Sequence, residues 1–353
     1  MRPVYLSGRG LACSLGLDVN SSLATLRRGG AAPSDYTLPG EMGGHFPYCA
    51  IPYSRPDWNE RARDLVQRVA CEADAQQSCK GALFIATSSF DIGAVEQGAA
   101  QLDYSAFADK IAAWLGWQGP VYLLSTACTS SSNALLAAHA LLSAGEVEEA
   151  LVLGVELDNR LTLGGFAALQ LLSPTGSKPF GAQRDGLMLG EAVAALRLST
   201  RESAHWRVMG GANEVDGRQP TGASAEAVVN MYRRALQSSG WAADTIDLIK
   251  VQAAGSPGND AVEAKGLRVA FAEMPALVSL KASLGHCMGA SGAAEIALLT
   301  ACLEQDAWPQ YPEEQDESLG VALAVAPPQQ LRRMLATILG FGGSHATVAL
   351  ECE

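Results

Sequence analysis

Cys128 lies where a chain can present a nucleophile. The run Val121-Tyr-Leu-Leu-Ser-Thr-Ala-Cys-Thr-Ser-Ser-Ser-Asn-Ala134 predicts a short apolar strand, a turn of small residues and the start of a helix. The thiol would then stand near the positive end of the helix dipole, a position that lowers a thiol pKa and favours the reactive thiolate. We therefore predict that Cys128 is a nucleophile and look for the residues that complete its site.

A second strand-to-helix junction carries Lys281 and His286. Residues 277–280 predict a strand and residues 290–303 a helix, with the lysine and the histidine in the loop between them. The order repeats that of strand 121–124, Cys128 and helix 131–144. Two equivalent loops that approach one site from two halves would bring Cys128 and His286 together, and a thiol beside an imidazole can act in nucleophilic catalysis.

The elements that must position these loops alternate between strand and helix. A continuous apolar run at 149–156 is typical of a strand buried on both faces. Such alternation favours an α/β layered fold. Further strands are predicted at 4–15 and 81–87, further helices at 21–28 and 60–80, and a long connection at 29–60.

The repeat predicts two similar halves packed together. Segments 186–196 and 339–350 resemble each other, and each predicts a hairpin with a glycine-rich turn followed by an apolar strand. We place the first half at residues 1–199, with Cys128. The second half, residues 200–353, carries Lys281, His286 and the Gly-Phe-Gly-Gly motif around Phe341.

Composition narrows the class of protein. The 353 residues are 48% hydrophobic, which suits a large core, and 25 basic minus 37 acidic residues give a net charge of −12, which argues against nucleic acid as a partner. The eight cysteines form no Cys-x-x-Cys pair, and no signal-like N-terminus is evident, so we expect reduced thiols and a cytoplasmic location. No apolar run is long enough to span a membrane.

Four motifs together resemble the β-ketoacyl-acyl-carrier-protein synthases, the ketosynthases of fatty acid and polyketide assembly. They occur in the family's order: Thr126-Ala-Cys-Thr-Ser-Ser, Lys178-Pro-Phe-Gly-Ala-Gln-Arg-Asp-Gly, Leu280-Lys-Ala-Ser-Leu-Gly-His-Cys-Met-Gly, and Gly340-Phe-Gly-Gly-Ser-His-Ala. The resemblance covers nearly the whole chain. It implies the thiolase-like fold, a duplicated αβαβα arrangement of five layers, and a dimer. It implies no resident cofactor or metal, because phosphopantetheine arrives attached to an acyl carrier protein.

The resemblance also implies roles for individual residues. Cys128 would take an acyl group from the carrier thioester, and Phe341 would gate the pocket and share an oxyanion hole with the cysteine. His286 matches the second of two histidines that handle the malonyl extender, and Lys281 matches the lysine that supports it. The remaining matches are carboxylates: Glu295 on a helix that orders the network, and Asp260 and Glu263 after the loop of the first histidine.

The chain departs from the family at that first histidine. The family motif reads roughly Asn-Ala-His-Gly-Thr-x-Thr-Pro, whereas this chain has Val251-Gln-Ala-Ala-Gly-Ser-Pro-Gly-Asn-Asp260. Ala254 stands in place of the histidine, and Ser256 replaces the first of two threonines that hold the pantetheine arm. Because loss of one oxyanion donor costs about 10²–10³ in rate, we expect acyl transfer to survive and decarboxylative condensation to suffer.

Other candidate residues have simpler interpretations. Cys287 beside His286 is expected to pack in the core, and four further histidines are expected to be structural or exposed: His45, His139, His205 and His345. His345 replaces the family's usual asparagine, which leaves a pocket role open. Three arginine pairs are expected to be solvated, with contact to an acidic carrier protein as the alternative: Arg27-Arg28, Arg233-Arg234 and Arg332-Arg333.

Three functions fit these observations. In the first, the chain is a chain-length-factor-like partner of a complete ketosynthase in a type II fatty acid or polyketide system, such as one that makes aryl polyenes. In the second, it is an autonomous 3-oxoacyl synthase or acyltransferase that uses Cys128, Lys281 and His286. In the third, it is a non-catalytic scaffold that binds a carrier protein or a sister subunit. Ala254 favours the first function, and the retained Cys128 favours the second.

Overall fold

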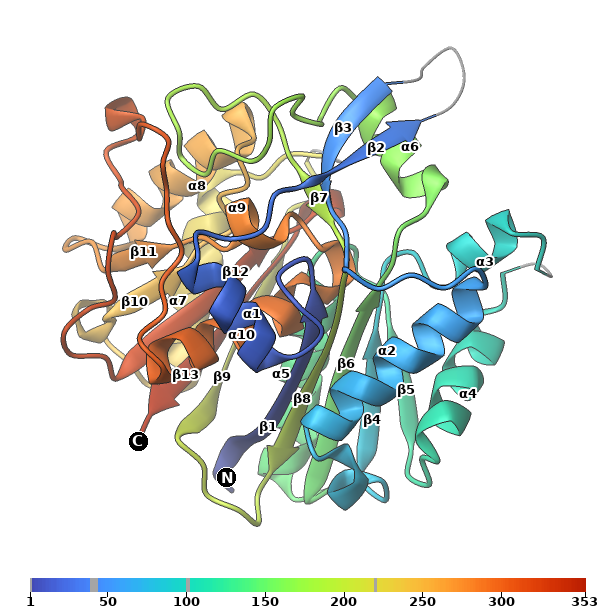
Figure 1. Ribbon diagram of the computed structural model, residues 1–353. Helices are drawn as coiled ribbons and strands as arrows, with labels where there is room; N and C mark the ends of the chain where they lie inside the picture. Colours follow the sequence, from blue (N-terminus) through green and yellow to red (C-terminus); the bar gives the residue numbers. More distant parts are fainter. Residues whose placement is uncertain (1, 39–43, 100–101, 219–220) are drawn as a thin grey trace.

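Ten strands join in one mixed sheet (Figure 1). The computed structural model describes residues 2–38, 44–99, 102–218 and 221–353. Within this part of the chain the strand order is β11-β10-β12-β13-β9-β1-β8-β6-β4-β5, and β2, β3 and β7 form a separate small sheet. The buried, near-continuously apolar strands explain why the large sheet is covered on both faces.

The large sheet divides into two equivalent sets of five strands. The first half contains β1 (Val4–Cys13), α1 (Val19–Arg27), β2 (Ser34–Leu38), β3 (Gly44–Cys49), α2 (Trp58–Glu72), β4 (Ala82–Ala86), α3 (Ile92–Glu96), α4 (Tyr104–Leu115), β5 (Val121–Leu124), α5 (Ser130–Ala144), β6 (Glu149–Glu156), α6 (Arg160–Ala168), β7 (Leu189–Gly190) and β8 (Ala192–Ser199).

The second half contains β9 (Trp206–Val215), α7 (Ala225–Ser239), β10 (Leu248–Lys250), α8 (Pro257–Ala270), β11 (Ala276–Val278), α9 (Lys281–Leu284), α10 (Ser291–Glu304), β12 (Arg333–Leu339) and β13 (Ser344–Cys352). Strands β1, β4, β5, β6 and β8 thus correspond in order and pairing to β9, β10, β11, β12 and β13. The predicted division at 199 and 200 lies between β8 and β9.

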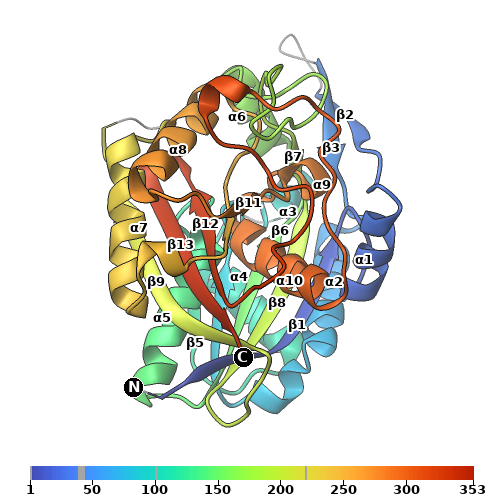
Figure 2. The ribbon, with the colours of Figure 1, turned by 90° about the vertical axis from the view of Figure 1, so that its left-hand side faces the viewer.

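The two half-sheets and the helices that cover them form five layers (Figures 1 and 2). Helix α2 packs on the first half-sheet with α4 beside it, and α7 packs on the second with α8 beside it. Helices α5 and α10 contact each other, and each contacts strands of both half-sheets, so they form the central layer. The predicted thiolase-like αβαβα fold is therefore confirmed.

The half-sheets meet edge to edge. Strand β1 pairs antiparallel with β9 over Val4, Tyr5 and Leu6, and then continues along β8. Central helix α10 is buried almost along its whole length, from Ser291 to Cys302. A helix that is buried on nearly every side is expected between two sheets rather than at a surface.

Two local predictions were wrong. The stretch 29–60 is not only a connection, because β2 and β3 form an antiparallel pair within it. The stretch 186–196 is not a hairpin: β7 pairs in parallel with β3, whereas β8 pairs with β6 and β1. The physical reason lies in the connections. In the second half a four-residue turn, residues 340–343, joins β12 to β13, whereas in the first half the link from β6 to β8 includes α6 and is far too long for a hairpin.

Among the described residues, none of the helices has the length and apolar character needed to cross a bilayer.

Candidate active site

Cys128 ends a strained turn directly before α5. Ala127 has a φ of 52°, the left-handed region that residues with a Cβ seldom adopt. The Ser130 hydroxyl accepts a hydrogen bond from the Thr126 N–H at 2.9 Å and donates one to the Ala127 carbonyl at 2.6 Å, which fixes the turn. Such strain is held where the surrounding structure over-determines it. Cys128 is buried.

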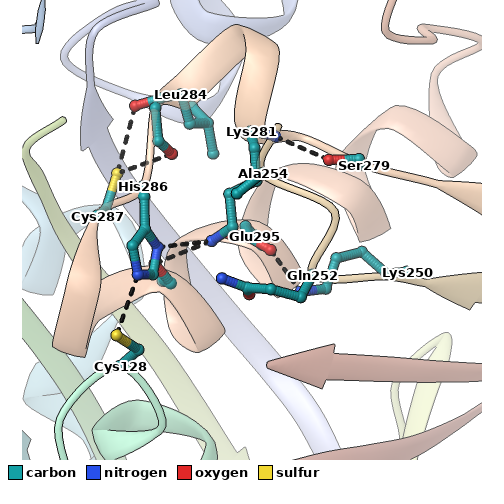
Figure 3. A network of polar contacts seen from close by, with 12 residues as sticks. Cys128, Lys250, Gln252, Ala254, Ser279, Lys281, Leu284, His286, Cys287 and Glu295 are labelled. Carbon is teal, nitrogen blue, oxygen red and sulfur yellow. Dashed lines mark hydrogen bonds and ion pairs between the residues drawn. The ribbon is translucent and has the colours of Figure 1, made fainter. Parts of the chain in front are cut away.

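His286 meets Cys128 from the other half of the molecule (Figure 3). The His286 Nε2 lies 3.0 Å from the Cys128 Sγ. The backbone N–H of His286 donates to the Met188 carbonyl at 2.7 Å. The two strand-to-helix loops that the repeat pointed to are thus brought together, as predicted from the sequence.

A buried ionic network supports the histidine. The Lys281 Nζ lies 3.1 Å from the His286 Nδ1 and 3.2 Å from the Ser291 Oγ, and it pairs with the Glu295 carboxylate. The Lys250 ammonium pairs with the other oxygen of Glu295. Burial alone would raise the pKa of Glu295, but the two ammonium groups hold that pKa below its usual range.

The network fixes the proton on the imidazole. An ammonium group paired with a carboxylate can only donate, so the His286 Nδ1 accepts from Lys281 and the proton of the neutral ring lies on Nε2. Burial, with help from Lys281 and Lys250, lowers the pKa of His286 well below its usual value, which keeps the ring neutral. The Nε2–H therefore points at the sulfur of Cys128.

The expectation of a lowered thiol pKa was wrong. Burial raises the pKa of Cys128 above its ordinary value and outweighs both the Phe341 N–H and the charge of Lys281, which act in the opposite direction. The site therefore holds a protonated thiol at rest, and the hydrogen-bond donors around the sulfur act when charge develops there.

The Gly-Phe-Gly-Gly turn between β12 and β13 delivers a backbone donor to the thiol. The Phe341 N–H faces the Cys128 sulfur closely enough to act against the rise of the thiol pKa. A Cβ on Gly340 would lie 2.9 Å from the Ser344 carbonyl oxygen, and one on Gly343 only 1.7 Å from the Asp216 carbonyl oxygen, so both positions need glycine. The Phe341 ring stacks on Phe166 of α6, with centroids 5.2 Å apart.

Two buried carboxylates shape the loop that carries Ala254. Glu263 accepts from the N–H groups of Gln252 and Ala253, both at 2.7 Å, and Asp260 accepts from those of Ala254 and Gly255 at 3.1 Å. Burial raises the pKa of Asp260 to about 6 and that of Glu263 to about 7, although these N–H groups oppose the shift. The two acids that the sequence singled out thus hold the loop from beneath.

A small cavity joins the two sides of the site. Its volume is about 20 Å³, room for a single water molecule. The residues that line it are Cys128, Leu187, Gln252, Ala254, Ser256, Asn259, Asp260, Glu263, His286, Leu339 and Phe341. Ser256 directly precedes α8, lines the cavity, and makes no side-chain hydrogen bond to the start of the helix.

Three contributors were missed from the sequence. Lys250 shares Glu295 with Lys281, Phe166 stacks on Phe341, and Glu156 accepts from the N–H groups of Ser89 at 2.9 Å and Gly289 at 2.7 Å. A lysine and a glutamate at the ends of apolar strands signal buried partners, because such charges are seldom buried unpaired. Glu156 ties the loop after β4 to the segment that follows His286.

The other sequence candidates lie elsewhere. Of the described residues around the cavity, His286 is the sole histidine; His345 is buried in β13, and Cys287 is buried with its thiol directed at backbone carbonyls. Within the described ranges, no three His, Cys, Asp or Glu side chains gather as metal ligands would. The site as built offers a thiol, an imidazole N–H and backbone N–H groups, the groups that acyl transfer requires.

The chain is similar to a known protein family and to curated relatives. The family model described as "Beta-ketoacyl synthase, N-terminal domain" matches residues 80–204, and the corresponding C-terminal domain matches residues 205–313. A chloroplastic 3-oxoacyl-[acyl-carrier-protein] synthase II of Arabidopsis thaliana is 30% identical over 66% of this chain and 48% of its own length. A 3-oxoacyl-[acyl-carrier-protein] synthase 2 of Mycobacterium leprae is 29% identical over 64% of this chain and 59% of its own. The chain thus spans less than two thirds of the length of these curated relatives.

Solved structures share the fold. A ketosynthase (ApeO) in complex with its chain length factor (ApeC) from Xenorhabdus doucetiae matches with a TM-score of 0.86 and 23% identity, over 100% of this chain and 98% of the matched chain. The ishigamide ketosynthase/chain length factor matches with a TM-score of 0.84 and 22% identity, over 100% and 99%. At these identities the likeness concerns the architecture.

Proposed function

The chain belongs to the β-ketoacyl synthase family, and we propose that it is a subunit of a type II fatty acid or polyketide system that accepts an acyl group on Cys128 but condenses weakly by itself. The observation that carries the proposal is the 3.0 Å contact between the Cys128 Sγ and the His286 Nε2 in a cavity whose opposite wall is Ala254. The first feature supports acyl transfer, and the second removes a donor from condensation.

Acyl transfer uses the groups already in place. The Cys128 sulfur attacks the carbonyl carbon of a carrier-protein thioester, a new C–S bond forms, the C–S bond to the carrier breaks, and the thiol proton passes to the departing carrier sulfur. The His286 Nε2–H and the Phe341 N–H face the sulfur as charge develops. The N–H groups of Cys128 and Phe341 are our proposed oxyanion hole for the carbonyl oxygen.

Condensation requires more of the site. A malonyl extender loses CO₂, and the enolate oxygen that forms must be stabilised by hydrogen-bond donors until its carbon attacks the acyl group on Cys128. Ala254 has no side-chain donor, so His286 would act without the second histidine that the family motif carries. We expect condensation to be slower by about 10²–10³ than in a site with both donors.

Pairing with a partner subunit is part of the same proposal. Structures alike in fold include complexes of a ketosynthase with its chain length factor, and we propose that this chain pairs in that manner with a complete ketosynthase. The acyl carrier protein delivers both substrates as phosphopantetheine thioesters, so the chain itself needs no resident cofactor.

The intact thiol, imidazole and ammonium favour a second candidate. With Cys128, His286 and Lys281 in contact, the chain can also be an autonomous condensing enzyme that works slowly on an undemanding extender. The two candidate functions differ in whether condensation depends on the presence of a complete ketosynthase.

One experiment separates them. The purified chain is incubated with an acyl carrier protein thioester, with and without a co-expressed ketosynthase that has both histidines, and followed by intact and native mass spectrometry. We expect an acyl adduct on Cys128, a heterodimer, and condensation with malonyl carrier that depends on the partner. A stable homodimer that condenses at full rate alone would overturn the partner role, and absence of an adduct would overturn acyl acceptance.

A further inference from the structure

The amide of Gln252 faces the reaction cavity without a partner. Gln252 follows β10 and lines the cavity together with Cys128, His286 and Ala254 (Figure 3). Gln252 is only 7% exposed, and its Oε1 makes no hydrogen bond to any described residue. Nearly every buried polar group in a native protein is paired, so an unpaired amide at a reaction site calls for a reason.

The backbone around Gln252 explains why its side chain is directed into the cavity. Successive residues of an extended segment point to opposite sides. Val251 and Ala253 pack in the hydrophobic core around α7 and α8, whereas Gln252 and Ala254 line the cavity. Glu263 binds the N–H groups of Gln252 and Ala253, which holds this alternation in place. The amide and the missing imidazole therefore share one wall.

The chemistry of the cavity indicates which ligand the amide is suited to bind. Space of about 20 Å³ holds one water molecule, or one oxygen atom of a substrate in its place. A carboxamide carries two N–H donors and one carbonyl acceptor, and rotation about its last bond exchanges them. Gln252 can therefore donate an N–H to an oxygen that lies between it and His286. The amide does so without gaining or losing a proton.

We propose that Gln252 is a catalytic residue of this site, whose amide N–H donates to the thioester carbonyl oxygen of the extender as that oxygen becomes an enolate. The inference rests on the proposed function, since it concerns the second substrate of the same cavity. Gln252 thereby supplies part of what Ala254 lacks, and the remaining part is supplied by His286.

The step balances without another reagent. The bond between the carboxylate carbon and Cα of the malonyl thioester breaks, CO₂ leaves, and the electron pair moves into the enolate held by Gln252 and His286. The enolate carbon then bonds to the acyl carbon on Cys128, the C–S bond breaks, and the thiolate takes a proton from solvent. His286 is free for this role because a thioester sulfur accepts hydrogen bonds only weakly, so acylation releases its Nε2–H.

The test replaces the amide by an apolar group of similar size. Gln252→Leu is compared with the wild-type chain in the presence of acyl and malonyl carrier-protein thioesters. Intact mass measures acyl loading of Cys128, and the release of labelled CO₂ from malonyl carrier protein measures decarboxylation. We expect loading within twofold of wild type and CO₂ release lower by about tenfold or more. Gln237→Leu, on the exposed side of α7, is the matched control and should change neither rate.

A stability measurement separates a catalytic from a structural role. Because the buried amide lacks a partner, Gln252→Leu should melt at the same temperature as wild type or higher. A lower melting temperature together with loss of both loading and CO₂ release would mean that Gln252 only supports the fold, and would overturn the inference. In an Ala254→His background, where the imidazole donates instead, the effect of Gln252→Leu on CO₂ release should shrink to within about threefold.

The two proposals fail in different ways. Normal loading with CO₂ release that is unaffected by Gln252→Leu would overturn the role of Gln252 alone. Absence of loading in the wild-type chain would overturn the proposed function, and this inference with it.

Discussion

The two walls of the cavity are both fixed by buried polar contacts, but their side chains offer different chemistry. On the thiol wall, a chain of contacts leads from Cys128 through His286 and Lys281 to Glu295, and each of these contacts pairs polar atoms. On the alanine wall, residues 252–255, the backbone is fixed by Asp260 and Glu263, but the side chains offer a methyl group and an unpaired amide.

The difference shows that the shape of this loop does not depend on the side chain at position 254. Asp260 and Glu263 bind backbone N–H groups, and these exist whichever residue occupies position 254. The loop therefore keeps its shape without a histidine, while the chemistry of that wall changes. A site of this kind should separate two reactions that a complete ketosynthase performs together.

Removal of the thiol should have the largest effect. Cys128→Ala should abolish the acyl adduct, because Cys287, the cysteine next to His286, does not line the cavity and its thiol is directed at backbone carbonyls. Intact mass after incubation with acyl carrier protein gives the result directly. Cys287→Ala is the matched control and should load normally; an adduct that persists in Cys128→Ala would place the nucleophile elsewhere.

Breaking the ionic network should destabilise the thiol wall. In Glu295→Gln two buried ammonium groups, those of Lys250 and Lys281, lose their only carboxylate among the described residues, and such a loss costs about 3–5 kcal/mol of unfolding free energy. Urea unfolding measures the change. Glu226→Gln, which breaks an exposed pair with Arg218, should cost less than about 1 kcal/mol. Equal losses in the two variants would contradict the account.

Restoring an imidazole should repair the alanine wall. Ala254→His should raise condensation by about 10²–10³, or 3–4 kcal/mol, and leave loading of Cys128 unchanged. Product formation from acyl and malonyl carrier thioesters is the measurement. Ala254→Phe fills the same space without a donor, so a gain in that variant as well would show that shape rather than hydrogen bonding limits the reaction.

The carboxylates under the alanine wall should make stability depend on pH. Burial raises the pKa of Glu263 from 4.5 to about 7, so the folded chain binds more protons than the unfolded chain between these values. The unfolding free energy should therefore fall as pH rises through this window, by an amount on the order of 3 kcal/mol for this group.

Glu263→Gln removes that titration. Urea unfolding at pH 5 and pH 8 should show a smaller loss of stability in the variant than in the wild-type chain, whereas Glu226→Gln should follow the wild type. An unchanged difference between the two pH values in Glu263→Gln would mean that this carboxyl titrates normally in the fold.

Local signals predicted much of the architecture. The apolar run at 149–156 coincides with β6, and the strand at 121–124 coincides with β5. The similarity of the two strand-to-helix junctions placed Cys128 and His286 in one site because the fold itself is duplicated. The hairpin predicted at 186–196 failed because the two halves differ in their last connection, and a short glycine-rich segment does not reveal which strand it pairs with.

Long-range contacts could not be predicted in the same way. Lys250 meets Glu295 across 45 positions of sequence, and Phe166 meets Phe341 from the other half. The raised pKa of Cys128 also escaped prediction, because the helix-end position is visible in the sequence whereas the depth of burial is a property of the whole fold. The unpaired amide of Gln252 likewise becomes evident only once the cavity is formed.

We propose that the thiol wall accepts the acyl group while the alanine wall limits condensation. The most direct measurement follows one sample of the wild-type chain: the rate at which Cys128 is acylated by a carrier thioester, and then the rate at which the acyl group is consumed when malonyl carrier protein is added without a partner. We expect acylation as fast as that of a complete ketosynthase and consumption slower by about 10²–10³. Equal rates for both steps, or no acylation at all, would contradict it.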